Sequence, residues 1–218
     1  MDNMKKVVIV GAGSHAAELE EYIFENNLIE NCFKIIGYLD DSKENYEKSK
    51  LNYPLIGGLF CENLTEDIEL ILSINNIKLR TRIIDFYKHK DIAFSNFIHH
   101  TSRLFRTSEI GEGNIICPYS QIGPNVKIGS FNTFNNKSSV GHDSIIGDNN
   151  VFCPNIGLSG NTKIGNNNFF SLNVATIPSV SVGDYNVIAP NMVIEKNIDS
   201  NSTFFQRFKE RVLVIPKD

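Results

Sequence analysis

An apolar residue recurs at every sixth position through the second half of this 218-residue chain. The register runs from Ile110 to Ile194 without an insertion, and fourteen of its fifteen positions are apolar. Gly follows the apolar position seven times, and Asn recurs three positions after it. Because Gly and Asn tolerate the left-handed backbone conformation best, they mark places where the chain turns sharply. The pattern therefore predicts short strands that alternate with tight corners.

A fixed period of six residues is typical of a solenoid, in which each repeat packs only on its neighbours. The repeats resemble the hexapeptides of the left-handed parallel β-helix, in which three hexapeptides form one triangular coil of about eighteen residues. Residues 110–197 would then form about five such coils. A β-sandwich, the alternative fold, would show a period of two with turns about every 8–12 residues. The sequence favours the β-helix.

Residues eighteen positions apart stack at the same corner of successive coils, about 4.8 Å from each other, which is the spacing of paired strands. His142, in the stretch SSVGHDSIIGDN, therefore has Gly160 directly above it. A glycine there leaves its backbone N–H open to a ligand. His142 alone is equally compatible with a solvent-facing turn residue, but the adjacent Asp143 and the stacked glycine favour a catalytic role.

The first half of the chain alternates strand-like and helix-like segments. Short apolar runs predict strands over residues 6–10, 33–41, 68–74 and 92–100, and periodic stripes predict helices over 15–27 and 76–90. This alternation is typical of a small parallel α/β sheet. We therefore expect an α/β domain in residues 1–105, a β-helix in residues 106–197 and a carboxyl-terminal tail in residues 198–218, for which the sequence indicates no role.

The segment GAGSHA links the first predicted strand to the first predicted helix. Gly11 and Gly13 match the glycine pattern of dinucleotide folds, in which backbone N–H groups hold a phosphate. Asp40 and Asp41 end the second strand, where they could bind a ribose hydroxyl, and His15 would add a donor for anionic oxygens. The α/β region is too short for a complete dinucleotide domain, so a nucleotide sugar is favoured over a nicotinamide cofactor. A glycine turn that binds nothing is the alternative.

Charge and cysteine usage exclude several classes of function. The net charge of −4 gives no basic surface for nucleic acid, and residues 7–10 are too short an apolar run for a signal or a membrane span. Four scattered cysteines without a CxxC pair predict free thiols. We expect a cytoplasmic protein with no nucleic-acid, membrane or metal partner.

Together, GAGSHA, GYLDD, PLIGGL, FIHHTS, NNKSSVGHDSIIGDNN and LSGNTKIG resemble one family over nearly the whole chain. It comprises the bacterial sugar O- and N-acetyltransferases similar to PglD, NeuD and VioB, which join a half-Rossmann domain to a left-handed β-helix. The resemblance implies a homotrimer that transfers an acetyl group from acetyl-CoA without a covalent intermediate. It also implies a nucleotide-linked (UDP or dTDP) 4-amino-4,6-dideoxyhexose as acceptor, for the biosynthesis of a lipopolysaccharide, capsule or similar surface glycan.

The resemblance also implies roles for individual residues. His142 would be the general base, Asp143 would increase its basicity, and the Gly160 N–H would stabilise the oxyanion. An imidazole suits proton transfer near neutral pH, and a fixed donor at the oxyanion is worth about 3–4 kcal/mol. The remaining implied contacts are Gly11, Gly13, Ser14, His15, Asp40, Asp41 and Asn135 for the sugar nucleotide, and Val151, Gly160, Leu172 and Pro190 for acetyl-CoA.

The sequence departs from the family at several positions. Many members have a second histidine where Val151 stands, and their loop commonly reads SGH where this chain has Gly13-Ser14-His15. His99 and His100 are expected to be surface residues at a strand end. Two further hypotheses remain beside the N-acetyltransferase: an O-acetyltransferase for sialic acid or another sugar, and a non-catalytic hexapeptide scaffold.

Overall fold

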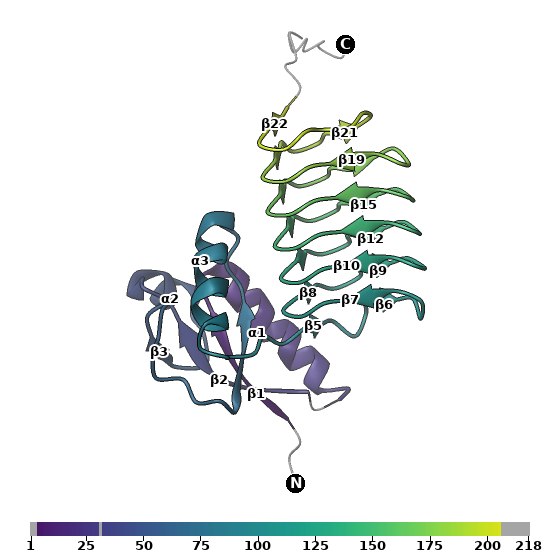
Figure 1. Cartoon of the computed structure of the whole chain (residues 1–218). Coiled ribbons are helices and arrows are strands. Elements are labelled where there is room, and N and C mark those ends of the chain that lie inside the picture. The colour runs from purple at the N-terminus through teal and green to yellow at the C-terminus, as the bar shows by residue number, and fades with distance from the viewer. Residues whose placement is uncertain (1–3, 31, 206–218) are drawn as a thin grey trace, which may run out of the picture.

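The computed structural model describes residues 4–30 and 32–205 of the chain. An α/β domain lies at the amino-terminal end, and a long β-helix extends from it (Figure 1). This architecture confirms the predicted fold class, a small half-Rossmann domain followed by a left-handed parallel β-helix of hexapeptide repeats. Among the described residues, no helix is long and apolar enough to cross a membrane.

The α/β domain is built on a parallel sheet of four strands in the order β3-β2-β1-β4. The strands are β1 (Lys5–Val10), β2 (Phe33–Leu39), β3 (Leu55–Gly57) and β4 (Ile68–Leu72), and the helices are α1 (Ser14–Asn27), α2 (Lys43–Ser49) and α3 (Ile77–Lys88). Residues 7–10 are fully buried in β1, as a strand covered on both faces requires. The sequence analysis predicted β1, β2, β4, α1 and α3 and did not predict α2 or β3.

The segment predicted as a fourth strand over residues 92–100 is divided between the two parts of the molecule. Its beginning lies along β4, where Phe94 forms one isolated bridge with Leu70, and its end belongs to the β-helix. There, β5 (Phe97–Ile98) pairs with β8 (Ile115–Ile116), and β6 (Arg103–Leu104) pairs with β9 (Gln121–Ile122). Ile98 and Leu104 stand in the six-residue register, so the coils begin before the expected boundary at residue 106. An apolar run alone does not reveal which sheet it joins.

Three parallel sheets form the walls of the β-helix. The seven-stranded sheet contains β5, β8, β11 (Thr133–Phe134), β14 (Val151–Phe152), β17 (Phe169–Phe170), β20 (Val187–Ile188) and β22 (Thr203–Phe204). The six-stranded sheet contains β6, β9, β12 (Ser139–Val140), β15 (Gly157–Leu158), β18 (Ala175–Thr176) and β21 (Val193–Ile194). The five-stranded sheet contains β7 (Glu109–Ile110), β10 (Lys127–Ile128), β13 (Ile145–Ile146), β16 (Lys163–Ile164) and β19 (Ser181–Val182).

Three corners join these sheets. The first corner comprises residues 99–102, 117–120, 135–138, 153–156, 171–174 and 189–192, and the second comprises 105–108, 123–126, 141–144, 159–162 and 177–180. The third corner comprises residues 111–114, 129–132, 147–150, 165–168 and 183–186. From Tyr119 to Asn191, every sixth residue has a positive φ, as predicted for the Asn positions. The final coil is two residues shorter than the others, because Thr203 pairs with Val187.

The interior of the β-helix is narrow and closely packed. Phe134, Phe152 and Phe170 stack through successive coils with ring centroids 4.6 and 4.9 Å apart. At the third corner, buried asparagines donate side-chain N–H groups to the neighbouring coils; Asn150, for example, donates to Asn132 Oδ1 of the preceding coil at 2.9 Å. These stacks fix the coil-to-coil register on which the geometry of the corners depends.

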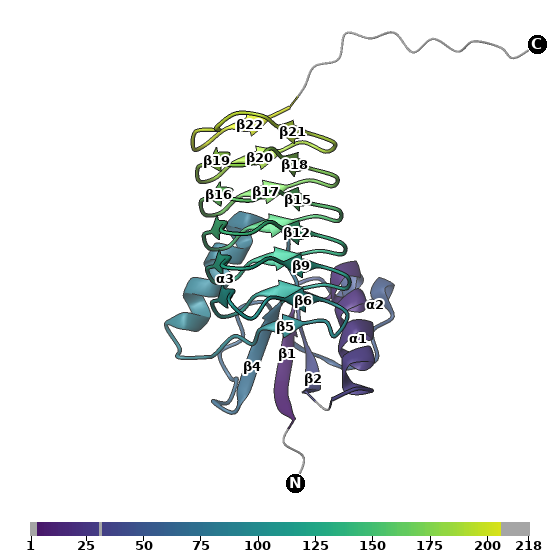
Figure 2. The same cartoon turned by 90° about the vertical axis from the view of Figure 1, so that its right-hand side faces the viewer.

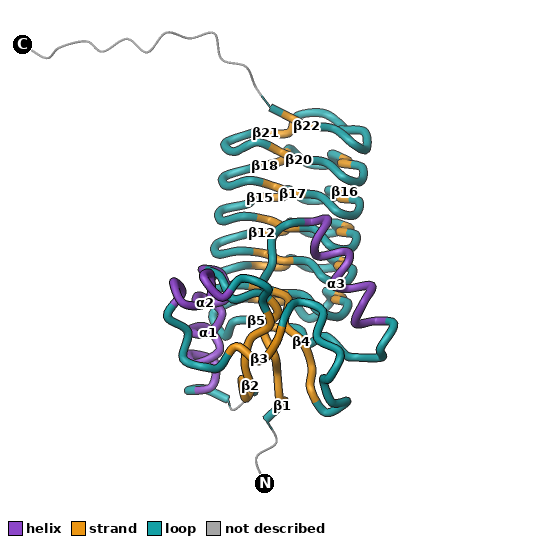
Figure 3. Tube along the Cα trace, turned by 90° about the vertical axis from the view of Figure 1, so that its left-hand side faces the viewer, coloured by secondary structure: helices purple, strands orange, loops and turns teal. Residues whose placement is uncertain are grey.

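The α/β domain packs against the seven-stranded sheet and the two corners beside it. Figures 2 and 3 show α3 and α1 on opposite sides of the lower part of the β-helix. Among the described residues, hydrogen bonds, ion pairs and ring contacts between the two parts involve only the first corner, the third corner and that sheet. The second corner, which includes His142, lies on the side away from the α/β domain.

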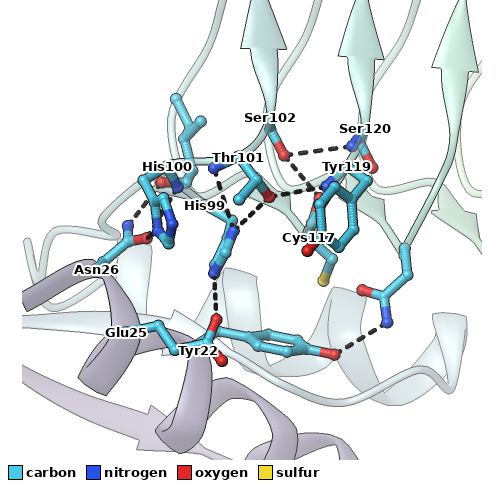
Figure 4. Close-up of polar contacts among 12 residues, drawn as sticks. Tyr22, Glu25, Asn26, His99, His100, Thr101, Ser102, Cys117, Tyr119 and Ser120 are labelled. Atoms are coloured by element: carbon cyan, nitrogen blue, oxygen red, sulfur yellow. Dashed lines mark hydrogen bonds and ion pairs between the residues drawn. The ribbon is translucent and has the colours of Figure 1, made fainter. Parts of the chain in front are cut away.

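The contact at the first corner is polar (Figure 4). His99 is only 1% exposed, and its Nε2 lies 2.9 Å from Glu25 Oε2 of α1. Asn26 of the same helix accepts the His100 N–H at 2.8 Å, and Tyr22 accepts a hydrogen bond from Asn136 at 2.9 Å. The expectation that His99 lies on the surface is therefore wrong, because α1 covers this strand end.

Candidate active site

The glycine loop between β1 and α1 lies at the carboxyl ends of the parallel strands. The chain runs from β1 to β2 on one side and later to β4 on the other, so β1 and β4 flank a topological switch point, where open α/β sheets bind ligands. Gly11 has a φ of +102°, and a Cβ there would lie 2.7 Å from Ser73 Oγ. Only glycine fits at this position, where the loop passes close to Ser73.

The two aspartates after β2 hold the neighbouring backbone. Asp40 accepts hydrogen bonds from Ala12 N and Ser42 N, both at 2.7 Å, and thereby ties the glycine loop to the end of β2. Asp41 accepts the Leu59 N–H at 2.9 Å. Both carboxylates therefore lie where the sequence analysis placed them, and both also stabilise the loops around the site.

Helix α1 begins directly after the glycine loop. Gly13 is its N-cap residue and makes no side-chain cap, and the backbone N–H groups of Ser14 and His15 donate to no acceptor among the described residues. A Cβ at Gly13 would meet nothing within 4 Å. Open N–H groups at a helix amino terminus favour an anionic ligand.

The imidazole of His15 is held by a strand on the other side of the loop. Its Nδ1 lies 3.3 Å from the Ser73 carbonyl oxygen, which can only accept, so Nδ1 bears the proton. Burial, and secondarily the charge of Arg80, lower the pKa of His15 to about 4. His15 is therefore neutral near pH 7, and its Nε2 has a lone pair without a partner in the part of the chain that the structure describes. The side chain is an acceptor here and does not supply the donor expected from the sequence.

His142 and Asp143 form a pair at the second corner. Asp143 adopts the left-handed conformation, with φ of +58°, and its Oδ2 lies 2.7 Å from His142 Nδ1. Hydrogen bonds from Asn125 and from His142 lower the pKa of Asp143, so the carboxylate is ionised and His142 Nδ1 is the donor. In the neutral tautomer with the proton on Nδ1, the other ring nitrogen, Nε2, has the lone pair that can accept a proton.

Gly160 lies one coil above His142, as the eighteen-residue repeat predicts. A Cβ at Gly160 would be 2.6 Å from His142 Nε2, so the imidazole lies directly against this glycine. The Asn161 N–H donates to the His142 carbonyl at 2.8 Å and fixes the two turns together. The Gly160 N–H donates to no acceptor among the described residues. A proton acceptor and an open backbone donor thus share one exposed corner.

The remaining predicted residues lie elsewhere in the chain. Asn135, Leu172 and Pro190 all lie at the first corner, where the Asn191 N–H donates to the Leu172 carbonyl at 3.0 Å. Leu172 is 47% exposed and Pro190 is exposed, so both are open to a ligand. Val151 is only 1% exposed on β14, between Thr133 and Phe169. Its side chain is covered, so the predicted contact between Val151 and acetyl-CoA is not available.

One copy of the chain does not bring the predicted site together. The glycine loop belongs to the α/β domain, Asn135 and Leu172 lie at the first corner, and His142 lies at the second corner, away from that domain. Sequence reasoning also missed Ser73, whose carbonyl binds the His15 ring, and Arg80, whose charge lowers the pKa of His15. Within residues 4–30 and 32–205, no cluster of His, Cys, Asp and Glu could hold a metal ion.

The amino-terminal domain matches a known family. The sequence family described as PglD N-terminal domain matches residues 6–86, which contain the glycine loop, Asp40, Asp41 and most of α3. A comparison with curated proteins gave no match.

Solved structures share the fold over most of the chain. The acetyltransferase domain of PglB from Neisseria gonorrhoeae, in complex with acetyl coenzyme A, has a TM-score of 0.80 and 20% identity, covering 92% of this chain and 97% of that chain. PerB from Caulobacter crescentus, in complex with CoA and GDP-perosamine, has a TM-score of 0.77 and 20% identity, covering 91% and 92%. WeeI from Acinetobacter baumannii has a TM-score of 0.64 and 22% identity, covering 92% and 96%.

The chain thus matches the PglD N-terminal domain over residues 6–86 and shares its overall fold with these acetyltransferase structures. These findings confirm the predicted resemblance to the PglD-like sugar acetyltransferases.

Proposed function

We propose that the protein is an acyltransferase that moves the acetyl group of acetyl-CoA to an amino sugar linked to a nucleotide. The acceptor is the 4-amino group of a 4-amino-4,6-dideoxyhexose on UDP or dTDP, and the product serves surface glycan synthesis. One observation is central: His142 donates through Nδ1 to an ionised Asp143, while its Nε2 lies against Gly160, whose N–H has no acceptor among the described residues. PglB and PerB, which share the fold, bind acetyl coenzyme A and CoA respectively.

The proposed reaction is a direct transfer. The amine nitrogen attacks the thioester carbonyl carbon, and its proton passes to His142 Nε2. The Gly160 N–H stabilises the developing oxyanion, a contribution typically worth about 3–4 kcal/mol. The intermediate then collapses, the C–S bond breaks, and the CoA sulfur takes the proton from the imidazolium. Asp143 holds the Nδ1–H tautomer and stabilises the positive charge while it exists.

The sugar nucleotide is proposed to bind at the switch point of the α/β sheet. The open N–H groups at the start of α1 would hold the diphosphate, with Gly11, Gly13, Ser14 and His15 around it. Asp40 and Asp41 stand at the adjacent strand end for the ribose. PerB, which has the same fold, binds GDP-perosamine, so the guanine nucleotide belongs in the test beside the uridine and thymidine nucleotides.

We propose a homotrimer in which two copies form each site. The second corner of one chain, with His142 and Gly160, would face the first corner of the next, with Asn135, Leu172 and Pro190. Support comes from the distribution of these residues over two corners and from the α/β domain on the opposite side of the β-helix from His142. Acetyl-CoA would lie in the cleft between the two corners.

A thiol-release assay with acetyl-CoA tests the function. The acceptors are UDP-, dTDP- and GDP-linked 4-amino-4,6-dideoxyhexoses and free sialic acid, and His142→Ala serves as the inactive variant. We expect turnover of a nucleotide-linked amine and a loss in His142→Ala of about 10²- to 10⁴-fold, the usual contribution of a general base. Turnover of sialic acid alone would instead identify an O-acetyltransferase, and full activity of His142→Ala would indicate that this histidine is not the base.

A further inference from the structure

Arg80 of α3 is a buried cation surrounded by uncharged acceptors. Its side chain is among the largest that are fully buried, with an exposed fraction of 1%. Burial lowers its pKa to about 9, so the guanidinium remains protonated at neutral pH. The acceptors are Asn149 Oδ1 (2.8 Å), Ile74 O (2.6 Å), Thr133 Oγ1 (3.3 Å), Leu72 O (3.5 Å) and Phe131 O. No ion pair involves Arg80 among the described residues.

These acceptors come from the two parts of the molecule. Asn149 and Phe131 belong to the third corner of the β-helix, and Thr133 belongs to β11. The other two are backbone carbonyls at the end of β4. Arg80 therefore fixes the segment after β4 relative to the β-helix. A planar guanidinium can satisfy this spread of acceptors, whereas a lysine ammonium cannot.

The segment that Arg80 holds also contacts the glycine loop. In extended backbone, alternate carbonyls point to opposite sides, so Leu72 O and Ile74 O face Arg80 while Ser73 O faces His15 Nδ1. The Ser73 hydroxyl donates to Val10 O at 3.0 Å, which anchors the same residue to β1. Rotation of this strand end would remove the acceptor that determines which nitrogen of His15 bears the proton.

The charged groups around His15 come from three elements. Arg80 approaches from α3, Asp40 and Asp41 follow β2, and Glu18 lies one turn along α1. Asp40 and Asp41 accept backbone hydrogen bonds, and only Arg80 adds a charge effect on His15 to that of burial. The guanidinium disfavours a second proton on the ring, so Nε2 keeps its lone pair.

We propose that Arg80 is a positioning residue of the sugar-nucleotide site: through the Ser73 carbonyl it fixes the proton of His15 on Nδ1, which leaves Nε2 as an acceptor for a hydroxyl or N–H group of the ligand. The identity of the ligand rests on the proposed function, but the state of His15 does not. A phosphate oxygen has no proton to donate to Nε2, so the diphosphate would bind the helix N–H groups while the sugar or ribose presents its donor to His15.

The ligand-free protein tests whether Arg80 controls the protonation and tautomer of His15. Nitrogen-15 NMR of the histidine side chains, assigned with His15→Gln, should show His15 as the neutral Nδ1–H tautomer from pH 8 down to about 5, because its pKa is about 4. In Arg80→Gln, His15 should protonate at higher pH and lose the single tautomer. In Arg80→Lys, the pKa of His15 should stay low, because the positive charge is kept. His15 should nevertheless lose its single tautomer, because an ammonium cannot replace the several N–H donors of the guanidinium. An unchanged His15 in a folded Arg80→Gln variant would overturn the proposal.

Kinetics test whether Arg80 also affects binding of the nucleotide sugar. Arg80→Gln should raise KM for the nucleotide sugar about tenfold, the loss expected for one misplaced buried hydrogen bond, with kcat and KM for acetyl-CoA within about twofold. Lys88→Met is the matched control, because Lys88 binds Glu112 and the Phe131 ring at the same interface and touches neither Arg80 nor His15. Lys88→Met should leave kcat, KM for the nucleotide sugar and KM for acetyl-CoA unchanged.

Two further outcomes are informative. If Arg80→Gln does not fold, Asn149→Ala removes the acceptor of Arg80 Nε alone and should raise the same KM about threefold. An equal change of kcat and both KM values in either variant would indicate a general packing role and refute the positioning role. If the wild-type protein turns over no nucleotide sugar, the proposed function fails, and the NMR titration still decides the role of Arg80.

Discussion

The Cα of Gly160 lies so close to the imidazole of His142 that a Cβ there would stand 2.6 Å from Nε2. The obstructing atom is the end of a side chain that can rotate away, so Gly160→Ala should fold normally but displace His142. We expect kcat in the thiol-release assay to fall about 100-fold, with a change in the free energy of unfolding below about 1 kcal/mol.

Gly157→Ala in the same coil is the control for this substitution. A Cβ at Gly157 would meet only Ala175 Cβ at 4.0 Å, which is ordinary contact. Its kcat should stay within about twofold of the wild type. Comparable losses in both variants would show that any added methyl group disturbs the coil, and the His142–Gly160 contact would then have no special role.

The charge of Asp143 is expected to matter for the rate. Asp143→Asn keeps a residue that tolerates the left-handed conformation, here φ of +58°, and removes the charge that stabilises the imidazolium. We expect kcat to fall at least about tenfold at every pH between 6 and 9. Because the pKa of Asp143 lies below its usual range, Asp143 stays ionised over these pH values and should add no limb of its own to the pH–rate profile.

Asn125→Gly separates the hydrogen bond from the charge. Asn125 donates to Asp143 Oδ1 at 3.0 Å and is the main cause of the lowered pKa. Its loss should raise the pKa of Asp143 towards the usual value of 3.8, which is still far below assay pH. The rate at pH 7 should therefore change less than about threefold. A loss as large as that of Asp143→Asn would mean that the orientation of the carboxylate, and not its charge, limits the rate.

Much of this second-corner site follows from the sequence because the six-residue period fixes its geometry. Because each coil has eighteen residues, Gly160 must stack on His142. The left-handed backbone conformations of Asn125 and Asp143 follow from the same repeat length. The interior stack of Phe134, Phe152 and Phe170 can likewise be predicted from the eighteen-residue register alone.

The surroundings of His15 could not be derived in this way. The Ser73 carbonyl that binds His15 and the Arg80 charge that acts on it come from segments about sixty residues away, and no periodicity links them. Arg80 stands in a helix whose basic residues suggest a solvated face, and its burial depends on the docking of α3 against the third corner. Helix α2 (KENYEKS) has no buried residue, so it lacked the apolar stripe by which helices are recognised.

Acid should destabilise the fold through His15. The unfolded chain takes up a proton on this residue near pH 6.5, while the folded chain does so only near pH 4. Between these values the unfolded chain binds more protons, so stability is complete above pH 6.5 and falls as the pH decreases towards 4. The loss from this one residue is about 3 kcal/mol at most. His99, whose pKa burial also lowers, acts in the same direction.

Urea unfolding of the wild type and of His15→Gln at pH 7.5, 6.0, 5.0 and 4.5 measures this effect. The variant has no titrating group at this position, so its stability should decrease less between pH 7.5 and 4.5, by roughly 2 kcal/mol or more. Parallel pH profiles for the two proteins would show that His15 is not held neutral in the folded state.

The division of the site between chains predicts complementation. His142→Ala removes the base and leaves the glycine loop intact. Gly13→Asp places a carboxylate where the diphosphate is proposed to bind; nothing lies within 4 Å of a Cβ at this position and Asp is a favoured N-cap residue, so it should fold. Each variant alone should be inactive. If each site takes its loop from one chain and its base from the next, every trimer that contains both variants has one intact site of its three.

The two variants should therefore be expressed together with different affinity tags, and the doubly tagged assemblies purified and assayed. About a third of the wild-type rate is expected, because each doubly tagged trimer has one intact site in three, together with the mass of a trimer in light scattering. If loop and base instead acted within one chain, every site in the mixture would lack one or the other, and no activity would return. The recovered rate thus distinguishes the two arrangements, because the α/β domain and His142 lie on opposite sides of the β-helix in each copy.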